Sequence, residues 1–296
     1  MKFVVTGGAG FIGSNIVKLL LKQNHTPIVI DNLCRGEIER ISSPEIEFHK
    51  VDIRNFDQLK KILKNSDGIF HQAALTDVQE SFTKQEEYND VNVKGTENIF
   101  KIAKEFNLKV VYASSSSIYG NPGKIPITEN SKRDPINPYG KTKLDDEFIA
   151  ENYSKDNVSI IGLRYFNVYG KGQTGSYAGV ITKFINKLKE NKDPIIFGSG
   201  TQVRDFIFVE DVALANISAM KSNVNNGFFN IGTGITTSIE QLAKIMIELS
   251  NLKLDIQYKD ALDGDVKFSQ ANTDLTESIL KWKYSVKLKD GLKTII

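Results

Sequence analysis

Over the first 115 residues, short apolar runs alternate with longer segments in which apolar residues recur every three or four positions. The runs are typical of buried strands, and the periodic segments are typical of amphipathic helices. Strand and helix in regular alternation predict an α/β fold built on a doubly wound parallel sheet. The strands are expected at residues 2–6, 27–31, 46–51, 68–71 and 110–113.

Beyond residue 150 the alternation is looser, which predicts a smaller mixed unit. We expect a first domain over 1–168 and a second over 169–296, with a strand and a helix near 204–222 returning to the first. No linker rich in Pro, Ser or Gly and no internal repeat divides the chain. The later elements are expected to be helices at 137–153, 180–190, after Asp211 and at 238–249, and strands at 160–165, 194–197 and 204–209.

A glycine-rich segment joins the first expected strand to a helix at 11–21. Glycines there let the chain turn tightly, bring backbone N–H groups close to a phosphate, and pack the helix against the strand. The helix N-terminus then offers its positive end to a pyrophosphate. The alternative for the same pattern is a structural tight turn. The residues concerned are Gly7, Gly10, Phe11, Ile12 and Gly13.

Asp31 ends the second expected strand, 18 residues after Gly13. A carboxylate in this position accepts hydrogen bonds from the adenosine ribose and repels a 2′-phosphate, which favours NAD over NADP. Arg35 and Gly36 follow closely and are candidates for contact with a cofactor phosphate or the adenosine. The alternative for these two residues is a solvated loop.

Polar or small residues follow each of these strands, at the carboxyl edge where open α/β sheets bind their ligands. Asp31, Asp52, Ala73 and Ser115 should therefore line one crevice. Each of them alone fits a loop or capping residue equally well. Their shared placement is what favours a site.

Tyr139 and Lys143 lie four residues apart in the helix expected at 137–153, so their side chains share one helix face. A phenol has a pKa of about 10 in water and is a poor base at neutral pH, but a neighbouring ammonium favours the phenolate. Such a tyrosine can take the proton of a sugar hydroxyl while a hydride leaves the same carbon for NAD. Ser115 is expected to hydrogen-bond to that oxygen, and Ser116 is the alternative residue for this role.

Composition narrows the class of protein. The 296 residues are 40% hydrophobic and 25% charged with a net charge of +2, as in ordinary globular proteins, and they suggest no nucleic-acid partner. The one cysteine, Cys34, fits a reducing compartment. We expect a cytoplasmic protein without a leader peptide or a membrane helix. The three histidines show no metal-ligand spacing.

Taken together, these segments resemble the extended short-chain dehydrogenase/reductases of the NAD-dependent epimerase/dehydratase family, over nearly the whole chain. Within that family they are similar to the UDP-hexose 4-epimerases. The resemblance implies a Rossmann-type fold, bound NAD and 4-epimerisation through a 4-keto intermediate, of UDP-glucose/UDP-galactose, of UDP-GlcNAc/UDP-GalNAc or of both. The segments that carry it are 6–13, 31–33, 52–53, 71–74, 92–96, 114–116, 139–143, 164–167 and 203–207.

The resemblance also implies roles for single residues. It makes Ser115, Tyr139 and Lys143 the catalytic group. The cofactor contacts that it implies, beyond Tyr139 and Lys143, are Gly7, Gly10, Phe11, Ile12, Gly13, Asp31, Asn32, Leu33, Arg35, Gly36, Asp52, Ile53, Gln72, Ala73, Ala74, Asn92 and Phe166. The substrate contacts that it implies are Ser115, Ser116, Asn167, Val180, Ile195, Phe197, Arg204, Asp265 and Ser269.

Two departures from the family pattern concern the substrate. Where the family has Arg-Pro-Gly-Asp, this chain has Leu-Asp-Gly-Asp from Leu262 to Asp265. Leu262 thus replaces the arginine, and one charged contact to the diphosphate is lost. Lys267 is a candidate replacement, against the alternative of a surface lysine. Ser269 stands where epimerases restricted to plain hexoses carry a bulky Tyr, which favours room for a 2-acetamido group.

Alternatives remain on the same scaffold. An NDP-sugar 4,6-dehydratase needs an acid beside the catalytic serine, but Ser116 and Ser117 stand there. A 4-reductase is the other enzyme alternative, and a non-catalytic NAD sensor is the alternative from another class. The resemblance further implies a homodimer formed through the helix that carries Tyr139 and the segment 92–106.

Overall fold

The computed structural model describes residues 1–173, 179–261 and 266–296. Its centre is a seven-stranded parallel sheet in the order β11-β6-β5-β4-β1-β2-β3. This is the strand order of a doubly wound Rossmann sheet with one more edge strand, so the expected fold class is confirmed. The strands are β1 (Lys2–Thr6), β2 (Thr26–Ile30), β3 (Glu47–His49), β4 (Gly68–His71), β5 (Val110–Ser115), β6 (Ile160–Tyr165) and β11 (Asn226–Ile231).

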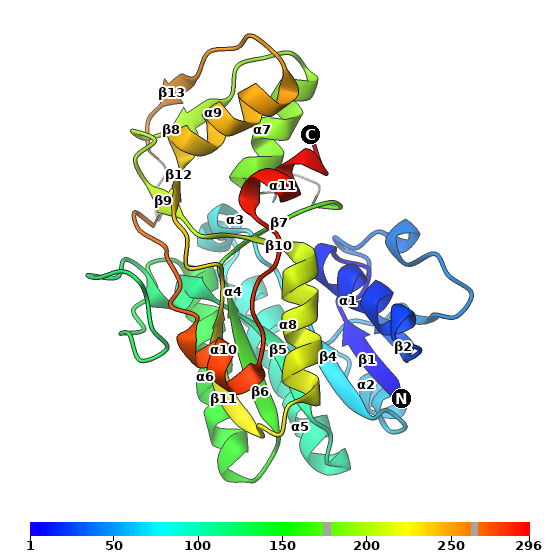
Figure 1. Ribbon diagram of the computed structural model, residues 1–296. Helices are drawn as coiled ribbons and strands as arrows, with labels where there is room; N and C mark the ends of the chain where they lie inside the picture. Colours follow the sequence, from blue (N-terminus) through cyan, green and yellow to red (C-terminus); the bar gives the residue numbers. More distant parts are fainter. Residues whose placement is uncertain (174–178, 262–265) are drawn as a thin grey trace.

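Helices cover both faces of the sheet (Figure 1). Successive side chains of a strand point to opposite faces, so Phe3 and Val5 of β1 pack on one side and Val4 on the other. The first face is covered by α1 (Phe11–Lys22) and α8 (Val209–Lys221), and the second by α2 (Phe56–Leu63), α5 (Gly95–Phe106) and α6 (Pro138–Lys155).

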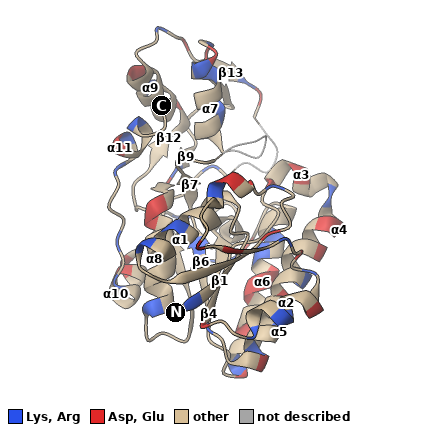
Figure 2. Ribbon diagram, turned by 90° about the vertical axis from the view of Figure 1, so that its right-hand side faces the viewer, with Lys and Arg blue, Asp and Glu red and all other residues tan. Residues whose placement is uncertain are grey.

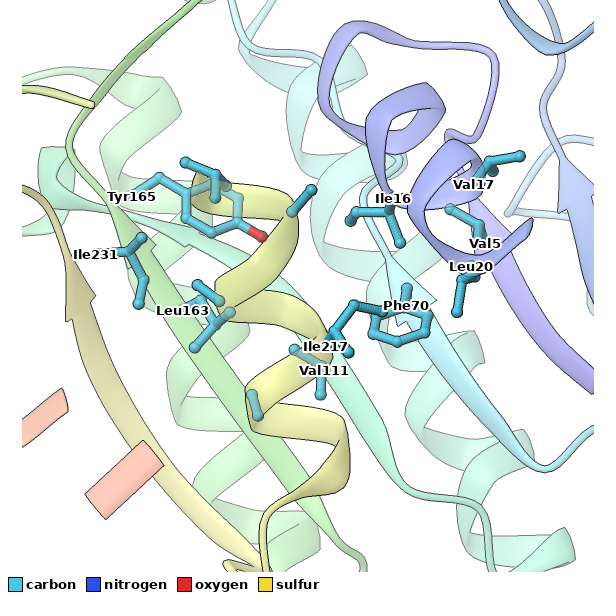
Figure 3. Close-up of a cluster of buried hydrophobic side chains, with 14 of the residues drawn as sticks. Val5, Ile16, Val17, Leu20, Phe70, Val111, Leu163, Tyr165, Ile217 and Ile231 are labelled. Atoms are coloured by element: carbon cyan, nitrogen blue, oxygen red, sulfur yellow. The ribbon is translucent and has the colours of Figure 1, made fainter. Parts of the chain in front are cut away.

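The core on the first face is drawn in Figure 3. Ile16 and Leu20 of α1 face Val5 and Phe70 of the sheet, Val17 belongs to the same cluster, and all five are fully buried. Burying a side chain of this size stabilises the fold by about 1.5–3 kcal/mol. The apolar positions of α1 thus hold the helix against the strand that precedes its glycine-rich turn.

A second, smaller part of the chain packs beside the carboxyl edge of the sheet (Figure 1). Its own core joins Phe184, Leu242 and Met246 to Tyr169 and Phe208. Its elements are β7 (Asn167–Tyr169), α7 (Val180–Lys189), β8 (Ile195–Phe197), β9 (Val203–Arg204), β10 (Phe206–Phe208), β12 (Thr237–Ser238), α9 (Ile239–Ser250), β13 (Gln257–Lys259) and α11 (Leu288–Lys293). The division of the chain at residue 168 stays a prediction.

The helix expected from Ser238 has the capping geometry that its sequence suggests. The Ser238 hydroxyl accepts the N–H of Gln241, and the Gln241 side chain accepts the N–H of Ser238, so two N-terminal amides of α9 are satisfied. The helix ends at Asn251, which adopts the left-handed conformation with φ 56°.

Several elements differ from the sequence-based expectation. The strand expected at 204–209 is wrong as one element, because the backbone breaks at Asp205 and its halves, β9 and β10, pair with β12 and β7. β11 was not expected at all. Within 92–106 only α5 is an α-helix, because a π-helical turn, η2 (Asn89–Lys94), precedes it. The remaining short helices are η1 (Ile38–Ile41), α3 (Val78–Thr83), α4 (Gln85–Tyr88), η3 (Ser116–Tyr119) and α10 (Asp274–Leu280).

Charges of both signs are interspersed on the helices that cover the sheet (Figure 2). In the ranges that the structure describes, no helix is both long enough and apolar enough to cross a membrane.

Candidate functional site

The glycine-rich turn connects β1 to α1 at the carboxyl edge of the sheet. Gly7 has φ +66°, and a Cβ there would lie 2.7 Å from the backbone nitrogen of Ala73. At Gly13 an added Cβ would overlap the carbonyl oxygen of Gly7. Both positions therefore need glycine, the first for its conformation and the second for the close approach of helix to turn.

We expect Gly13→Ala to weaken dinucleotide binding by at least about tenfold and to lower the unfolding free energy by about 1–3 kcal/mol, because the turn must open to admit the methyl group. Titration with NADH fluorescence and urea unfolding measure the two effects. Gly123→Ala is the matched control, since a Cβ at Gly123 meets nothing within 4 Å. Equal behaviour of the two variants would contradict the tight turn.

Asp31 follows β2 at the same edge, with its carboxylate fixed by backbone. It accepts the N–H of Leu33 at 2.8 Å and the N–H of Ala9 at 3.1 Å. Burial raises the pKa of Asp31, and these two hydrogen bonds oppose the rise. The second bond links Asp31 directly to the glycine-rich turn, as a dinucleotide site at this place requires.

A cavity of about 420 Å³ opens in front of the turn. Three of the four residues expected in one crevice, Asp31, Asp52 and Ala73, line it, whereas Ser115 is not among its walls. The candidate cofactor residues that line it are Gly7, Gly10, Phe11, Ile12, Gly13, Asp31, Asn32, Arg35, Gly36, Asp52, Ile53, Gln72, Ala73 and Ala74. Those outside its walls are Leu33, Asn92, Tyr139, Lys143 and Phe166.

Asp52 is held in its ionised form on the cavity wall. Arg54 donates to both of its carboxylate oxygens, at 2.9 and 2.8 Å, and the Asn32 amide donates at 2.9 Å. Hydrogen bonding by Arg54 is the main reason that the pKa of Asp52 is lowered. The same guanidinium reaches Asp90 at 2.9 Å, so this wall is a fixed network of charges.

An ion pair joins a loop at the cavity to a short helix. Arg35, in the loop after β2, pairs with Glu80 of α3, in the segment after β4. The Glu80 carboxylate is itself held by the buried Tyr88 hydroxyl at 2.9 Å and by Lys84 at 2.9 Å. Because β2 and β4 flank β1 in the sheet, this bridge connects the segments on either side of the glycine-rich turn. We call it the Arg35–Glu80 bridge.

Asn92 and Phe166 are buried outside the walls of this cavity. The fully buried Asn92 amide binds both backbone groups of Leu75 and the Thr142 hydroxyl, so it fixes the segment after β4. Phe166 is buried in a small apolar cluster with Leu144 of α6.

Tyr139, Lys143 and Asp146 follow one face of α6 at spacings of four and three residues. Asn137 caps this helix by accepting the N–H of Gly140 at 2.8 Å. Tyr139 is half-buried, and its N–H donates to the Ser81 hydroxyl of α3. Lys143 is 2% exposed, and its Nζ lies 3.0 Å from Asp146 Oδ2.

The neighbours of this helix face come from β4, β5 and the short helix η3. His71 of β4 lies between the hydroxyls of Thr6 and Thr96, and burial together with the Lys143 charge lowers its pKa to about 3, so the imidazole is neutral. Ser115 ends β5, where its hydroxyl accepts the N–H of Ser117. Ser116 opens η3 and is half-buried.

A second cavity, of about 540 Å³, lies in the smaller part of the chain. It brings together five of the candidate substrate residues from four separate segments. These are Asn167, Val180, Ile195, Phe197 and Arg204.

The wall around Arg204 is anchored by its neighbour Asp205, which is fully buried. The Asp205 carboxylate accepts hydrogen bonds from the N–H groups of Thr233, Gly234 and Ala271 at 2.8–3.1 Å. Burial raises the pKa of Asp205, and these hydrogen bonds oppose the rise. Ser269, two residues before Ala271, is 5% exposed, and its N–H donates to Val203. Lys267 is exposed. Asp265 and the other residues that depart from the family motif, 262–264, lie outside the described residues.

Sequence reasoning missed residues that helical spacing could have found. Lys183 lines the second cavity one turn after Val180, and it takes part in no ion pair within the described ranges. Asp146 lies three residues after Lys143 on the face already singled out. Arg40 of η1 and Gln173, in the segment after β7, line the first cavity from places that no local pattern predicts.

The family model described as "NAD dependent epimerase/dehydratase family" matches residues 3–232. Among curated proteins, a putative UDP-glucose 4-epimerase of Methanocaldococcus jannaschii is 39% identical over 302 residues, which cover 99% of this chain and 96% of the relative.

Two solved structures are similar over almost the full length. The UDP-glucose 4-epimerase of Thermotoga maritima with UDP-glucose has a TM-score of 0.96 at 32% identity, covering 100% of this chain and 97% of that one. The UDP-N-acetylglucosamine 4-epimerase of Methanobrevibacter ruminantium, in complex with UDP-N-acetylmuramic acid, has a TM-score of 0.95 at 34% identity, covering 99% and 96%.

Proposed function

Because the chain belongs to the NAD-dependent epimerase/dehydratase family, we propose that it uses NAD to interconvert UDP-hexoses that are epimeric at C4. The relatives named for this reaction match the chain from end to end, which supports an epimerase of UDP-sugars. Two observations support the proposal: a glycine-lined cavity at the carboxyl edge of the sheet, where β5 ends in Ser115, and the shared face of α6 that carries Tyr139 and Lys143.

The first cavity fits NAD. Its floor is a turn where Gly13 leaves no room for a side chain, so backbone can approach a pyrophosphate. Its wall carries the fixed Asp31 carboxylate, which suits a ribose diol and disfavours a 2′-phosphate. When bound, NAD supplies the hydride acceptor.

We assign the proton transfers to this chain's own residues. Tyr139 takes the proton of the sugar 4-hydroxyl and later returns it to the 4-keto oxygen, after the sugar has turned over in the site. The Lys143 ammonium on the next helical turn favours the phenolate form of the tyrosine. Ser115 donates a hydrogen bond to the reacting oxygen. The sugar is oxidised and then reduced at one carbon, so no net redox change occurs.

We place the nucleotide of the substrate in the second cavity. Ile195 and Phe197 offer apolar surface to the base, and Asn167 and Arg204 offer donors to the diphosphate. Lys183 adds a cation to this cavity, whereas the family's usual arginine is replaced at Leu262. Ser116, Asp265 and Ser269 complete the candidate substrate contacts.

Incubation with a panel of UDP-, dTDP- and GDP-sugars, without added cofactor, tests the proposal. Conversion of a UDP-sugar to its 4-epimer, separated chromatographically, is the expected result. Loss of water from the product would favour a 4,6-dehydratase, and consumption of added NADH would favour a 4-reductase. Either of these outcomes would contradict the proposal.

We further propose that N-acetylated sugars are accepted, because Ser269 is much smaller than the tyrosine that the resemblance places here in epimerases restricted to plain hexoses. Ser269→Tyr is then expected to lower kcat/KM for UDP-GlcNAc by about 10–100-fold, a steric penalty of about 1–3 kcal/mol, and to affect UDP-glucose less. Ser269→Ala is the matched control and should keep both activities. Full activity of the tyrosine variant on UDP-GlcNAc would contradict the pocket assignment.

We propose a cytoplasmic enzyme of nucleotide-sugar metabolism that works as a homodimer. The exposed thiol of Cys34 favours a reducing compartment. The exposed Phe148 on α6 offers an apolar contact on one of the two helices expected at a dimer interface. Sedimentation of the purified chain tests the dimer.

A further inference from the structure

Asp146 is a carboxylate in an unusual place. It lies in the middle of α6 with no exposed surface, packed between the helix and the sheet. Carboxylates are almost never fully buried unless a partner compensates their charge. Its partner is Lys143, whose Nζ lies 3.0 Å away and is itself nearly fully buried.

The two residues thus form a buried ion pair one helical turn beyond Tyr139. Since Tyr139, Lys143 and Asp146 have spacings of four and three, all three lie on one face of α6. A carboxylate so close to an ammonium cancels much of its field at more distant groups, and it also disfavours loss of the ammonium proton.

We propose that Asp146 is a positioning residue for the reaction: as the buried counter-ion of Lys143, it holds the ammonium in place and sets the pH range in which the Tyr139–Lys143 pair works. The inference rests on the proposed function. Its basis is the contact itself, which gives the lysine a fixed partner on its own helix and makes its charge part of a neutral pair.

The other ionisable groups around the pair leave this role to Asp146. His71 of β4 is neutral, and Tyr112 of β5 and Tyr165 of β6 have pKa values raised by burial, so none of the three carries charge near neutral pH. The Thr96 hydroxyl of α5 bonds to the His71 ring at 2.9 Å, and the buried Oδ1 of Asp146 has no hydrogen-bond partner among the described residues. Two neighbouring charges on the same helix have partners of their own: Asp145 pairs outward with Lys141, and the buried Glu147 pairs with Arg164 of β6.

Burial raises the pKa of Asp146, and the Lys143 ammonium opposes that rise. The sign of the expected effect follows from Coulomb's law: a negative charge raises the pH at which its neighbours give up their protons. Asp146→Asn, which removes the charge and keeps the shape, should therefore move both limbs of the pH–rate profile to lower pH, by about one unit.

The experiment compares the pH dependence of kcat/KM for the best UDP-sugar in the native protein, Asp146→Asn and the control Asp145→Asn. The control removes the same charge one residue away, at a side chain that is 30% exposed and faces Lys141. Only Asp146→Asn is expected to shift the profile. Asp146→Ser removes the charge with less bulk and serves if the asparagine variant does not fold.

A second readout does not depend on turnover. Tyrosinate absorbance is titrated for each variant and for the same variant carrying Tyr139→Phe, and the difference reports Tyr139 alone. Ionisation of Tyr139 at lower pH in Asp146→Asn supports the inference. The inference would be overturned if Tyr139 ionised at the same pH in Asp146→Asn as in the native protein. It would also be overturned if kcat/KM fell by the same factor at every pH, without a shift of the pH–rate profile. Absence of epimerase activity in the native protein would count against the proposed function, and the titration would still decide the role of Asp146.

Discussion

Tyr139→Phe should lower the rate of UDP-hexose epimerisation by about 10²–10⁴-fold, because that is the size of the contribution that a positioned acid–base group makes. The variant loses one hydroxyl and keeps the aromatic ring at this position of α6, so the unfolding free energy should change by no more than about 0.5 kcal/mol. Initial rates of 4-epimer formation measure the first effect, and NADH titration shows whether the cofactor still binds.

Tyr153→Phe provides the matched control, since it removes the same hydroxyl from the same helix, 14 residues from the proposed base. It should retain activity. If Tyr139→Phe retained more than about a tenth of the native rate, a different group would have to accept the proton. Such a result would contradict the catalytic role proposed for Tyr139, but it would not contradict the fold or the cofactor cavity.

Arg164→Met should cost about 3–5 kcal/mol of unfolding free energy, because it leaves a buried carboxylate without its main partner. Arg164 of β6 is 2% exposed and donates twice to Glu147 of α6, each time at 2.8 Å. Its third branch reaches the Tyr119 hydroxyl at 2.7 Å. Glu147 also accepts from Ser114, the neighbour of Ser115, so the pair ties the end of β5 to the helix that carries Tyr139.

Arg133→Met is the control for this prediction. Arg133 contacts the same Glu147 at 3.1 Å, but its side chain is 26% exposed, and loss of such a contact costs about 1 kcal/mol or less. Urea unfolding of the two variants gives the comparison. Adding Glu147→Gln to Arg164→Met should recover part of the loss, since the stranded charge is removed. Equal costs for both arginines would contradict the assignment.

Much of the first half of the fold was predictable because its signals are local. The apolar run before Gly7 and the periodic residues of α1 each fit one element, and the glycines between them mark a turn with a steric reason. Asp31 and Asp52 could be placed at one edge because parallel strands share their carboxyl ends.

The rest depends on contacts that no local pattern encodes. β11 contains Gly227 and two asparagines, which are poor strand formers, and it forms because β6 offers an edge and because Asn230 bonds to Tyr119 and Ile127. The break at Asp205 follows from backbone amides of distant residues. Ser115 was expected in the same crevice as Asp31, but the strand end carries it outside that cavity's walls.

The Arg35–Glu80 bridge has a consequence for release of the cofactor. It connects the segments that flank the glycine-rich turn, so a dinucleotide bound there should dissociate more readily when this ion pair is broken. A dehydrogenase must release its spent cofactor after every turnover and would be slowed by such a restraint. An epimerase returns the hydride to the sugar and so regenerates its oxidised cofactor in each cycle. One tightly bound dinucleotide can therefore support many turnovers.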